Sequence, residues 1–466
     1  MRPLLALALA ALLAGCLGPA QPVDPAGLDP LAAVWRFTDF IVDDHEHNDQ
    51  ALHTFASPTM AELAHVPLGE DGAPYSYIGE IDTRANLSAV AIVARGSAPG
   101  FQLLDTTDPA QPQRLGRAEA PWAYGADVKL TADGAFALLA SQGPGTGGPV
   151  VPTDPTALAG PFLERSSIGV YDLADPLQPS LVHVAPVAPT GCHMITIGEV
   201  QGQEYVWCIN AALTTLRFDR APVPTLTPVA VYFPFGPDVP PTVVEKSLGV
   251  LPHDATFQLD PLDGTPLVVV SHWDLGVAVL DVTDPLAPRE LFRWAGEGAQ
   301  EYHGYVHSAQ LAKVGERRVL IATPETLSDV LPAIWLLDVT DWTQGALAAE
   351  WWNPGKHTSQ GLLMTTHQWQ VVGERLYLAY NHNGVWVLDL PTILANKGGA
   401  PDAAEILGVF QPHDAIDVFD PDLAVLPNVW DVNVVGGRIL ATDRYTGLHV
   451  LRYAGDPLAG EITSSA

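Results

Sequence analysis

The sequence predicts an all-β fold, a seven-bladed β-propeller made of four-stranded antiparallel blades. Two observations predict it: a repeated apolar strand that ends in Asp, and a composition that suits short strands joined by tight turns. The 466 residues include 41 Gly and 42 Pro, and only 16% of them are charged. Gly and Pro supply the backbone angles of turns, so we expect many short strands and no long helices.

The repeat is an apolar strand that ends in Asp and is followed, in its clearest copies, by an Asp-Pro turn. Clear copies lie at 101–109, 170–176 and 277–285, and weaker copies lie at 216–219, 335–341, 385–389 and 449–452. The residues that end the seven strands are Asp105, Asp172, Asp219, Asp281, Asp338, Asp389 and Arg452. Their mean spacing of about 58 residues accommodates four strands with loops, so seven copies predict seven blades. Asp can bond the backbone two residues on and Pro presets φ, so the motif is a strand exit and not a catalytic site.

These units resemble LVIVD repeats, a β-propeller repeat named for this strand, over roughly residues 60–455. The resemblance implies a propeller and says almost nothing about function. Three copies depart from the pattern: Trp342 replaces Pro in the fifth, Pro391 is displaced in the sixth, and Arg452 replaces Asp in the last.

The last unit lacks a fourth strand, because the chain turns polar soon after Tyr453. A blade that is missing its outer strand leaves an open sheet edge. Residues 61–66 precede the first unit and have the pattern of an outer strand, so we expect them to complete the last blade. The propeller then spans residues 59–455, and 456–466 form a C-terminal tail.

The N-terminus has the layout of a secretory signal, with Arg2 followed by an apolar run at 4–13 and small residues. This run is too short to span a bilayer. Residues 13–16, Leu-Ala-Gly-Cys, resemble the lipobox of prokaryotic lipoproteins, which implies a signal peptide at 1–15 and a lipidated Cys16. An ordinary signal peptide with a chance Cys is the alternative. We expect an exported protein, lipid-anchored to the membrane and facing the periplasm or cell exterior, with 16–58 as a Pro-rich tether and acidic, His-containing segment.

Charge and missing motifs exclude several functions. Lys and Arg number 22 against 53 Asp and Glu, and the resulting net charge of −31 repels nucleic acid. The sequence contains no Gly-x-Ser-x-Gly, no His-Glu-x-x-His, no phosphate-binding Gly-rich loop and no dinucleotide fingerprint. Hydrolase and nucleotide-dependent functions therefore have no motif in their favour.

Apart from Cys16, the chain has two cysteines, Cys192 and Cys208. An even number in an exported protein favours a disulfide. A hairpin that turns about Val200 would place the two directly opposite each other across the strands. The alternative is a pair of thiolate metal ligands.

Histidine recurs at the start of the innermost strand in four consecutive units. These residues are His193, His253, His307 and His367. Because strands alternate in direction, two sets of connecting loops lie on the same face, and they carry five further histidines. These are His272, His303, His357, His382 and His413. We expect the first four near the axis as candidate metal ligands, with the other five around them or on a rim that contacts substrate.

Neutral imidazole is a common ligand of copper, zinc and iron, so a transition metal is the expected cofactor if the cluster binds one. A framework role stays open at this point. Blades arise by duplication, so a histidine repeated in register can equally be a structural residue that bonds the neighbouring blade.

Two functions from different classes fit these observations. The first is a cell-surface binding or scaffold module whose loop face holds an extracytoplasmic protein, glycan, small molecule or metal. The alternative is a copper- or iron-dependent oxidoreductase that uses the inner histidines. In architecture and histidine content the chain is similar to the selenium-binding protein and methanethiol oxidase group, whose propellers are thought to use copper held by histidines. That group's motifs do not match residue by residue, so whether the chain is an enzyme stays open.

Overall fold

A computed structural model describes residues 55–68, 78–93, 99–120, 125–141, 167–187, 191–209, 212–233, 252–273, 275–294, 306–325, 334–352, 365–397, 402–412, 415–416, 424–425 and 427–456. The expected signal peptide at 1–15, the tether with Cys16, and residues 457–466 lie outside the described residues.

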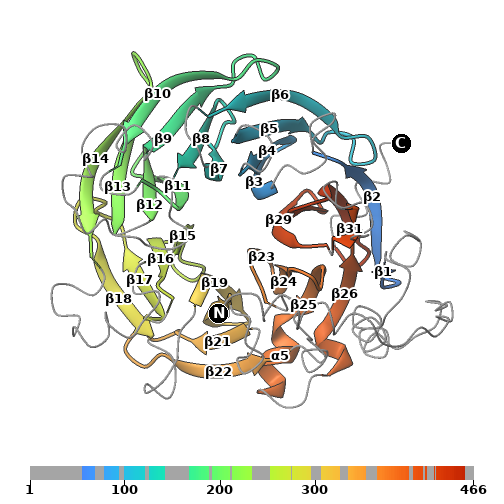
Figure 1. Cartoon of the computed structure of the whole chain (residues 1–466). Helices are drawn as coiled ribbons and strands as arrows, with labels where there is room; N and C mark the ends of the chain where they lie inside the picture. Colours follow the sequence, from blue (N-terminus) through green and yellow to red (C-terminus); the bar gives the residue numbers. More distant parts are fainter. Residues whose placement is uncertain are drawn as a thin grey trace, which may run out of the picture.

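Seven antiparallel sheets stand around a central axis, and in each the strands follow one another outward, which confirms the seven-bladed propeller (Figure 1). Blade 1 contains β3 (Ile78–Arg84), β4 (Leu87–Ile92), β5 (Gly100–Asp105) and β6 (Gln113–Glu119). Blade 2 contains β7 (Gly125–Leu130), β8 (Phe136–Ser141), β9 (Ser167–Asp172) and β10 (Ser180–Pro186). Blade 3 contains β11 (Met194–Val200), β12 (Gln203–Ile209), β13 (Leu213–Asp219) and β14 (Thr225–Tyr232). Blade 4 contains β15 (Asp254–Leu259), β16 (Pro266–Ser271), β17 (Val277–Asp281) and β18 (Arg289–Trp294).

The remaining blades hold the helical segments of the described chain. Blade 5 contains β19 (Val306–Val314), β20 (Arg317–Pro324), β21 (Ile334–Asp338) and β22 (Ala346–Trp351). Blade 6 contains β23 (Trp369–Val372), β24 (Arg375–Ala379), β25 (Val385–Asp389) and β26 (Ile406–Gln411), with α5 (Leu390–Asn396) and η5 (Ala403–Glu405) between its last two strands. The small pair β27 (Ala415–Ile416) and β28 (Ala424–Val425) precedes β29 (Val429–Val435), β30 (Arg438–Asp443) and β31 (Gly447–Tyr453) of blade 7. Within these residues no helix has the length and apolarity needed to cross a membrane.

The repeated Asp residues make the turns that the sequence predicts. Asp105, Asp172, Asp281 and Asp338 each accept a hydrogen bond from the backbone N–H two residues on, at 2.8–3.0 Å. In the sixth copy Asp389 instead caps α5 and accepts from the Thr392 N–H at 3.0 Å. The displaced proline explains the difference, because Pro in the first turn of a helix loses no hydrogen bond.

Two N-terminal strands close the ring. β2 (Met60–Val66) pairs antiparallel with β31, which confirms that this segment supplies the outer strand of blade 7. A further strand, β1 (Phe55–Ala56), which was not predicted, adds to the outer edge of blade 6 by pairing with β26. The N-terminal segment therefore joins two neighbouring blades, as Figure 1 shows at β1 and β2.

Side chains of the innermost strands also link every blade to the next. At six of the seven junctions a side-chain oxygen accepts from a backbone N–H of the following blade, and at the fifth Gln310 donates to the Trp369 carbonyl. The accepting side chains are Asp82, Asp127, Thr196, Gln258, Gln370 and Asp431. This belt fixes the height at which each innermost strand begins, so it aligns the residues at those strand starts.

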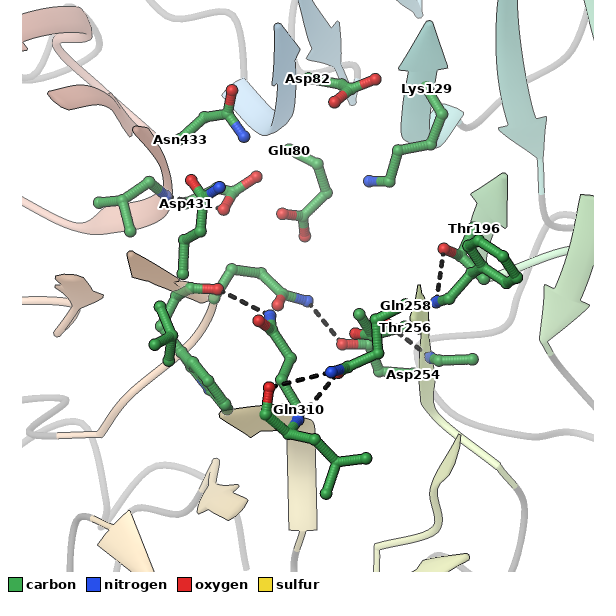
Figure 2. Close-up of a pocket in the computed structure, with 18 of the residues that line it drawn as sticks. Glu80, Asp82, Lys129, Thr196, Asp254, Thr256, Gln258, Gln310, Asp431 and Asn433 are labelled. Atoms are coloured by element: carbon green, nitrogen blue, oxygen red, sulfur yellow. Dashed lines mark hydrogen bonds between the residues drawn. The ribbon is translucent and has the colours of Figure 1, made fainter. Parts of the chain in front are cut away.

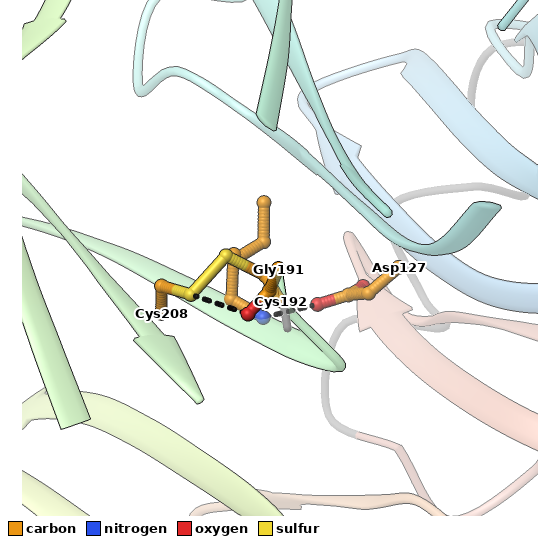
Figure 3. The surroundings of a disulfide bond; sticks show 5 residues. Asp127, Gly191, Cys192 and Cys208 are labelled. Carbon is orange, nitrogen blue, oxygen red and sulfur yellow. Dashed lines mark hydrogen bonds between the residues drawn. A yellow bond between two sulfur atoms is a disulfide. The ribbon is translucent and has the colours of Figure 1, made fainter. Parts of the chain in front are cut away.

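The disulfide between Cys192 and Cys208 forms as predicted, with the two Cα atoms 5.4 Å apart (Figure 3). The predicted register was wrong. Cys208 pairs with Ile195, and Cys192 lies before β11 begins. The hairpin turns at Gln201 and Gly202, not at Val200, because both turn residues adopt positive φ, 54° and 80°, as a two-residue type I′ turn requires.

Candidate metal centre

The four inner histidines form a continuous row across blades 3 to 6. His193 and His253 directly precede β11 and β15, His307 is the second residue of β19, and His367 lies just before β23. Successive ring centroids along the row are 4.5, 4.3 and 4.3 Å apart. The structure thus brings together all four residues that the sequence aligned.

Backbone carbonyls orient two of these rings. His307 Nδ1 lies 3.1 Å from the His367 carbonyl oxygen, and His367 Nδ1 lies 2.9 Å from the Trp430 carbonyl oxygen. A ring nitrogen that faces a carbonyl must carry the proton, so the lone pair of each ring is on Nε2. This is the tautomer in which a histidine can bind a metal through Nε2 while a hydrogen bond holds the ring in place.

Burial keeps the row neutral. It lowers the pKa of His193 to about 4, and it lowers the pKa values of His253 and His307 well below the usual 6.5, with neighbouring histidines adding to the effect. For His367, burial and then the Arg444 guanidinium lower the pKa in the same direction. The imidazoles are therefore ready to act as ligands at neutral pH without first losing a proton.

Glu325 joins the row from the connection after β20. Its Oε2 lies 3.5 Å from His307 Nε2, and within the described part of the chain His253, His307 and Glu325 each offer a ligand atom within 4.8 Å of the other two. Burial raises the pKa of Glu325 to about 7, while Arg444 opposes this rise. Glu325 was not predicted as a site residue. It follows β20 as His272 follows β16, so extending the alignment of these connections to carboxylates would have found it.

His193 extends the row through a direct contact. Its Nε2 lies 2.8 Å from His253 Nε2, so one of these nitrogens donates to the other. Two tryptophans lie against the same rings: Trp430 stacks on His367 at 3.4 Å between ring centroids, and Trp273 packs edge-on against His253 at 4.3 Å. The row is thus bounded by aromatic rings that restrict the rotation of the imidazoles.

Trp273 holds its place at some conformational cost. Its φ is 44°, which is unusual for a bulky side chain. Two backbone hydrogen bonds of 3.1 Å with Val306 hold it there. Positive φ at a large residue persists only where the surroundings fix it, and such residues cluster at functional sites.

The described residues include two of the five outer histidines, His272 and His382. His272 is buried directly after β16, and burial followed by the Arg293 charge lowers its pKa to about 3. His382 lies in the β24–β25 connection, where its carbonyl accepts from Gln411 Nε2 at 2.6 Å. His303, His357 and His413 fall outside the described residues, so their predicted place around the row stays a prediction.

The shifted pKa of His193 gives a prediction for stability. In the unfolded chain the His193 imidazole takes up a proton near pH 6.5, whereas in the folded protein it does so only near pH 4. The stability that neutral His193 contributes is therefore lost as the pH falls through this window. We expect urea unfolding in the presence of a chelator to show wild type losing about 2 kcal/mol relative to His193→Gln between pH 7 and pH 4, after allowance for the partly exposed ring. A constant difference between the two proteins across this range would contradict the prediction.

Comparisons with known proteins identify the fold only. No protein-family model matches the chain, and no curated protein matches it. Among solved structures, the Cps50 (Swd1) β-propeller domain of Myceliophteria thermophila is similar, with a TM-score of 0.50, 10% sequence identity, and coverage of 84% of this chain and 99% of that domain. At this identity the likeness shows the propeller fold alone.

Proposed function

We propose that the protein is an exported, lipid-anchored propeller of the LVIVD-repeat type that acts as a binding module and holds a transition metal at the histidine row. One observation carries the proposal: His253, His307 and Glu325 present three ligand atoms within 4.8 Å of one another. They lie beside two further imidazoles that burial keeps neutral.

The donor set favours particular metals. Imidazole nitrogen with one carboxylate suits copper, zinc and iron, whereas calcium and magnesium prefer sites made of oxygen alone. Each ligand comes from a different structural element of blades 4 and 5, and the belt of hydrogen bonds between blades holds these elements in place. A site on rigid strand starts is preorganised, so little entropy is lost when the metal binds.

The hydrogen bonding of the His307 ring supports a role as metal ligand over a purely structural role. His307 Nε2 makes no hydrogen bond among the described residues although the ring is fully buried, and the Glu325 carboxylate faces it at 3.5 Å. A structural histidine in a protein core normally satisfies both nitrogens. The bonded Nδ1 and unbonded Nε2 of His307 are what a ligand position requires.

Metal analysis tests this function. We expect protein purified from the exported fraction, or reloaded with Cu²⁺, Zn²⁺ or Fe²⁺ one at a time, to retain one equivalent of metal after dialysis. Retention of copper or iron with turnover of a thiol or another small reductant would support the oxidoreductase alternative, and retention of zinc without turnover would support the binding module. Absence of tightly held metal under every loading condition would refute the metal-binding proposal.

The membrane anchor gives a second prediction. We expect Cys16→Ala to release the protein from the membrane fraction, because one residue carries the lipid. Incorporation of labelled lipid into the variant protein measures this effect. Cys208→Ala, which keeps Cys16, is the control. The Cys192–Cys208 disulfide is consistent with the oxidising compartment that this proposal requires. Lipid incorporation into the Cys16→Ala variant would contradict it.

A further inference from the structure

A cavity of about 490 Å³ occupies the propeller axis beneath the histidine row. It begins near Glu80 and Met194 and reaches Lys313 and Gly373, which lie at or beside the hairpin turns at the far ends of the innermost strands. Its mouth is therefore on the face opposite the histidines. A volume of this size accommodates a small organic molecule.

The wall of the cavity is acidic. Glu80, Asp82, Asp254 and Asp431 line it, and the ammonium group of Lys129 projects among them (Figure 2). Lys129 is already bonded to Asp127 at 2.6 Å, and Lys313, at the mouth, lies 3.8 Å from Glu316. Four carboxyl groups thus surround one ammonium group, and burial raises the pKa of each carboxyl group above its usual value, so each one ionises more readily when a further cation lies beside it.

Two side-chain oxygen atoms on this wall, from Glu80 and Asn433, accept no hydrogen bond from an N–H or hydroxyl group of the described residues. Glu80 is 2% exposed, and its Oε1 accepts from Trp430 Nε1 at 3.1 Å. Burial and the neighbouring Asp431 carboxylate, with which the Glu80 carboxyl group shares a hydrogen bond, raise the pKa of Glu80 well above its usual value, and Oε2 accepts from no N–H or hydroxyl group of the described residues. The Oδ1 atom of Asn433 is likewise buried without a partner there. Figure 2 shows the Glu80 carboxylate pointing into the cavity. A buried acceptor without a donor is costly, so the cavity favours a ligand that brings donors.

The spread of the carboxylates argues for an organic cation over a bare metal ion. Among the described residues, the three-ligand group within 4.8 Å is the one at Glu325, and the acidic residues of the axial wall form no such group. A divalent ion needs several oxygens at about 2.0–2.6 Å, whereas an alkylammonium group needs only one carboxylate and can place further donors along its chain. A positive charge beside Glu80 also favours the ionised form of that carboxyl group.

We propose that the axial cavity binds a small aliphatic amine, a diamine or polyamine, with one ammonium group donating to Glu80 Oε2. The ligand enters from the face opposite the histidine row. The proposal does not rest on the metal-binding function: Glu80 Oε1 lies 3.8 Å from His367 Nδ1, but Glu80 is not one of the three proposed metal ligands, and an amine requires different ligand chemistry.

Calorimetric titration of the metal-free protein with putrescine and spermidine tests the proposal. We expect saturable binding of the amines and none of 1,4-butanediol, which has the putrescine chain without its charges. Glu80→Gln, which keeps the size and the acceptor for Trp430, should weaken binding by about ten- to a hundredfold, the effect of losing one charge-assisted hydrogen bond. Glu119→Gln, at an exposed carboxylate on β6 that does not line the cavity, is the matched control and should leave binding unchanged.

A second variant keeps the test decisive if Glu80→Gln unfolds, which a thermal melt would reveal. Asn433→Asp preserves the side-chain shape and adds a negative charge to the wall, so it should strengthen amine binding severalfold. The proposal is overturned if the amines do not bind, if 1,4-butanediol binds equally well, if Glu80→Gln binds as wild type does, or if Asn433→Asp binds more weakly. His253→Ala should keep amine binding, which separates failure here from failure of the metal site.

Discussion

Replacing His253 or His307 by Ala should remove most of the metal that the wild-type protein retains. Each residue supplies one of three ligand atoms within 4.8 Å, so its loss leaves at most two of that set. Loss of a residue that merely orients a ligand lowers metal affinity by about ten- to a hundredfold, and loss of the ligand itself should cost more. Elemental analysis after dialysis and a competition titration against a chelator of known affinity measure the effect.

Matched controls separate ligation from folding. His183→Ala changes a histidine on β10, in a different blade from the three proposed ligands, and should leave the metal content unchanged. Glu325→Gln keeps the size of the side chain and removes the charge, so it should weaken metal binding without the cavity that a change to Ala leaves. A framework role for the histidines predicts lower unfolding temperatures for His253→Ala and His307→Ala with no change in metal content, and that result would contradict the proposal.

The fold could be predicted because its signals are local. In the clear copies the Asp of the strand exit bonds the backbone only two residues away, as Asp105 and Asp281 do, so the motif can be recognised within each of these copies. Period and copy number then give the number of blades. The last blade runs out of strands at Tyr453, and that shortage pointed to β2 although its partner β31 is almost 400 residues away.

The register of the disulfide hairpin could not be predicted in the same way. Val200, Gln201 and Gly202 are all compatible with a turn in sequence, and the choice depends on which two residues adopt positive φ. A shift of the turn moves every cross-strand pair. The two cysteines still meet, because Cys192 reaches Cys208 from the segment before β11 and not from a paired strand position.

The clustering of the four inner histidines was predicted from sequence, whereas the carboxylate of Glu325 beside them was not. Register along the innermost strands identified the row, because equivalent positions in a propeller lie at equal height around the axis. Glu325 comes from a different connection and was overlooked since the search there considered histidines alone. The contacts that orient the rings, such as His367 Nδ1 to the Trp430 carbonyl, join residues about 60 positions apart and have no local signature.

Deletion of the N-terminal strands should produce the largest loss of stability. Removing residues 17–54 should spare folding, because the described sheet begins at Phe55. Removing residues 17–66 deletes β1 and β2 and exposes the edge of β31 along its whole length, together with the buried contact of Met60 with blades 6 and 7. Loss of a buried Met side chain alone costs about 2–5 kcal/mol, so we expect a total loss above about 5 kcal/mol and a strong tendency to aggregate.

An intermediate deletion separates the two strands. Removing residues 17–59 eliminates β1 and the hydrogen bonds that Ser57 and Thr59 make to Val409 and Leu407, but it keeps β2 paired with β31. Its stability should therefore fall between those of the other two deletions, because blade 6 retains β23 to β26 while its outer edge is uncovered. Thermal melts of the three proteins, with light scattering to detect association, measure the series. If the 17–66 deletion melts cooperatively at the wild-type temperature, the open edge carries no cost and β2 does not close the propeller in solution.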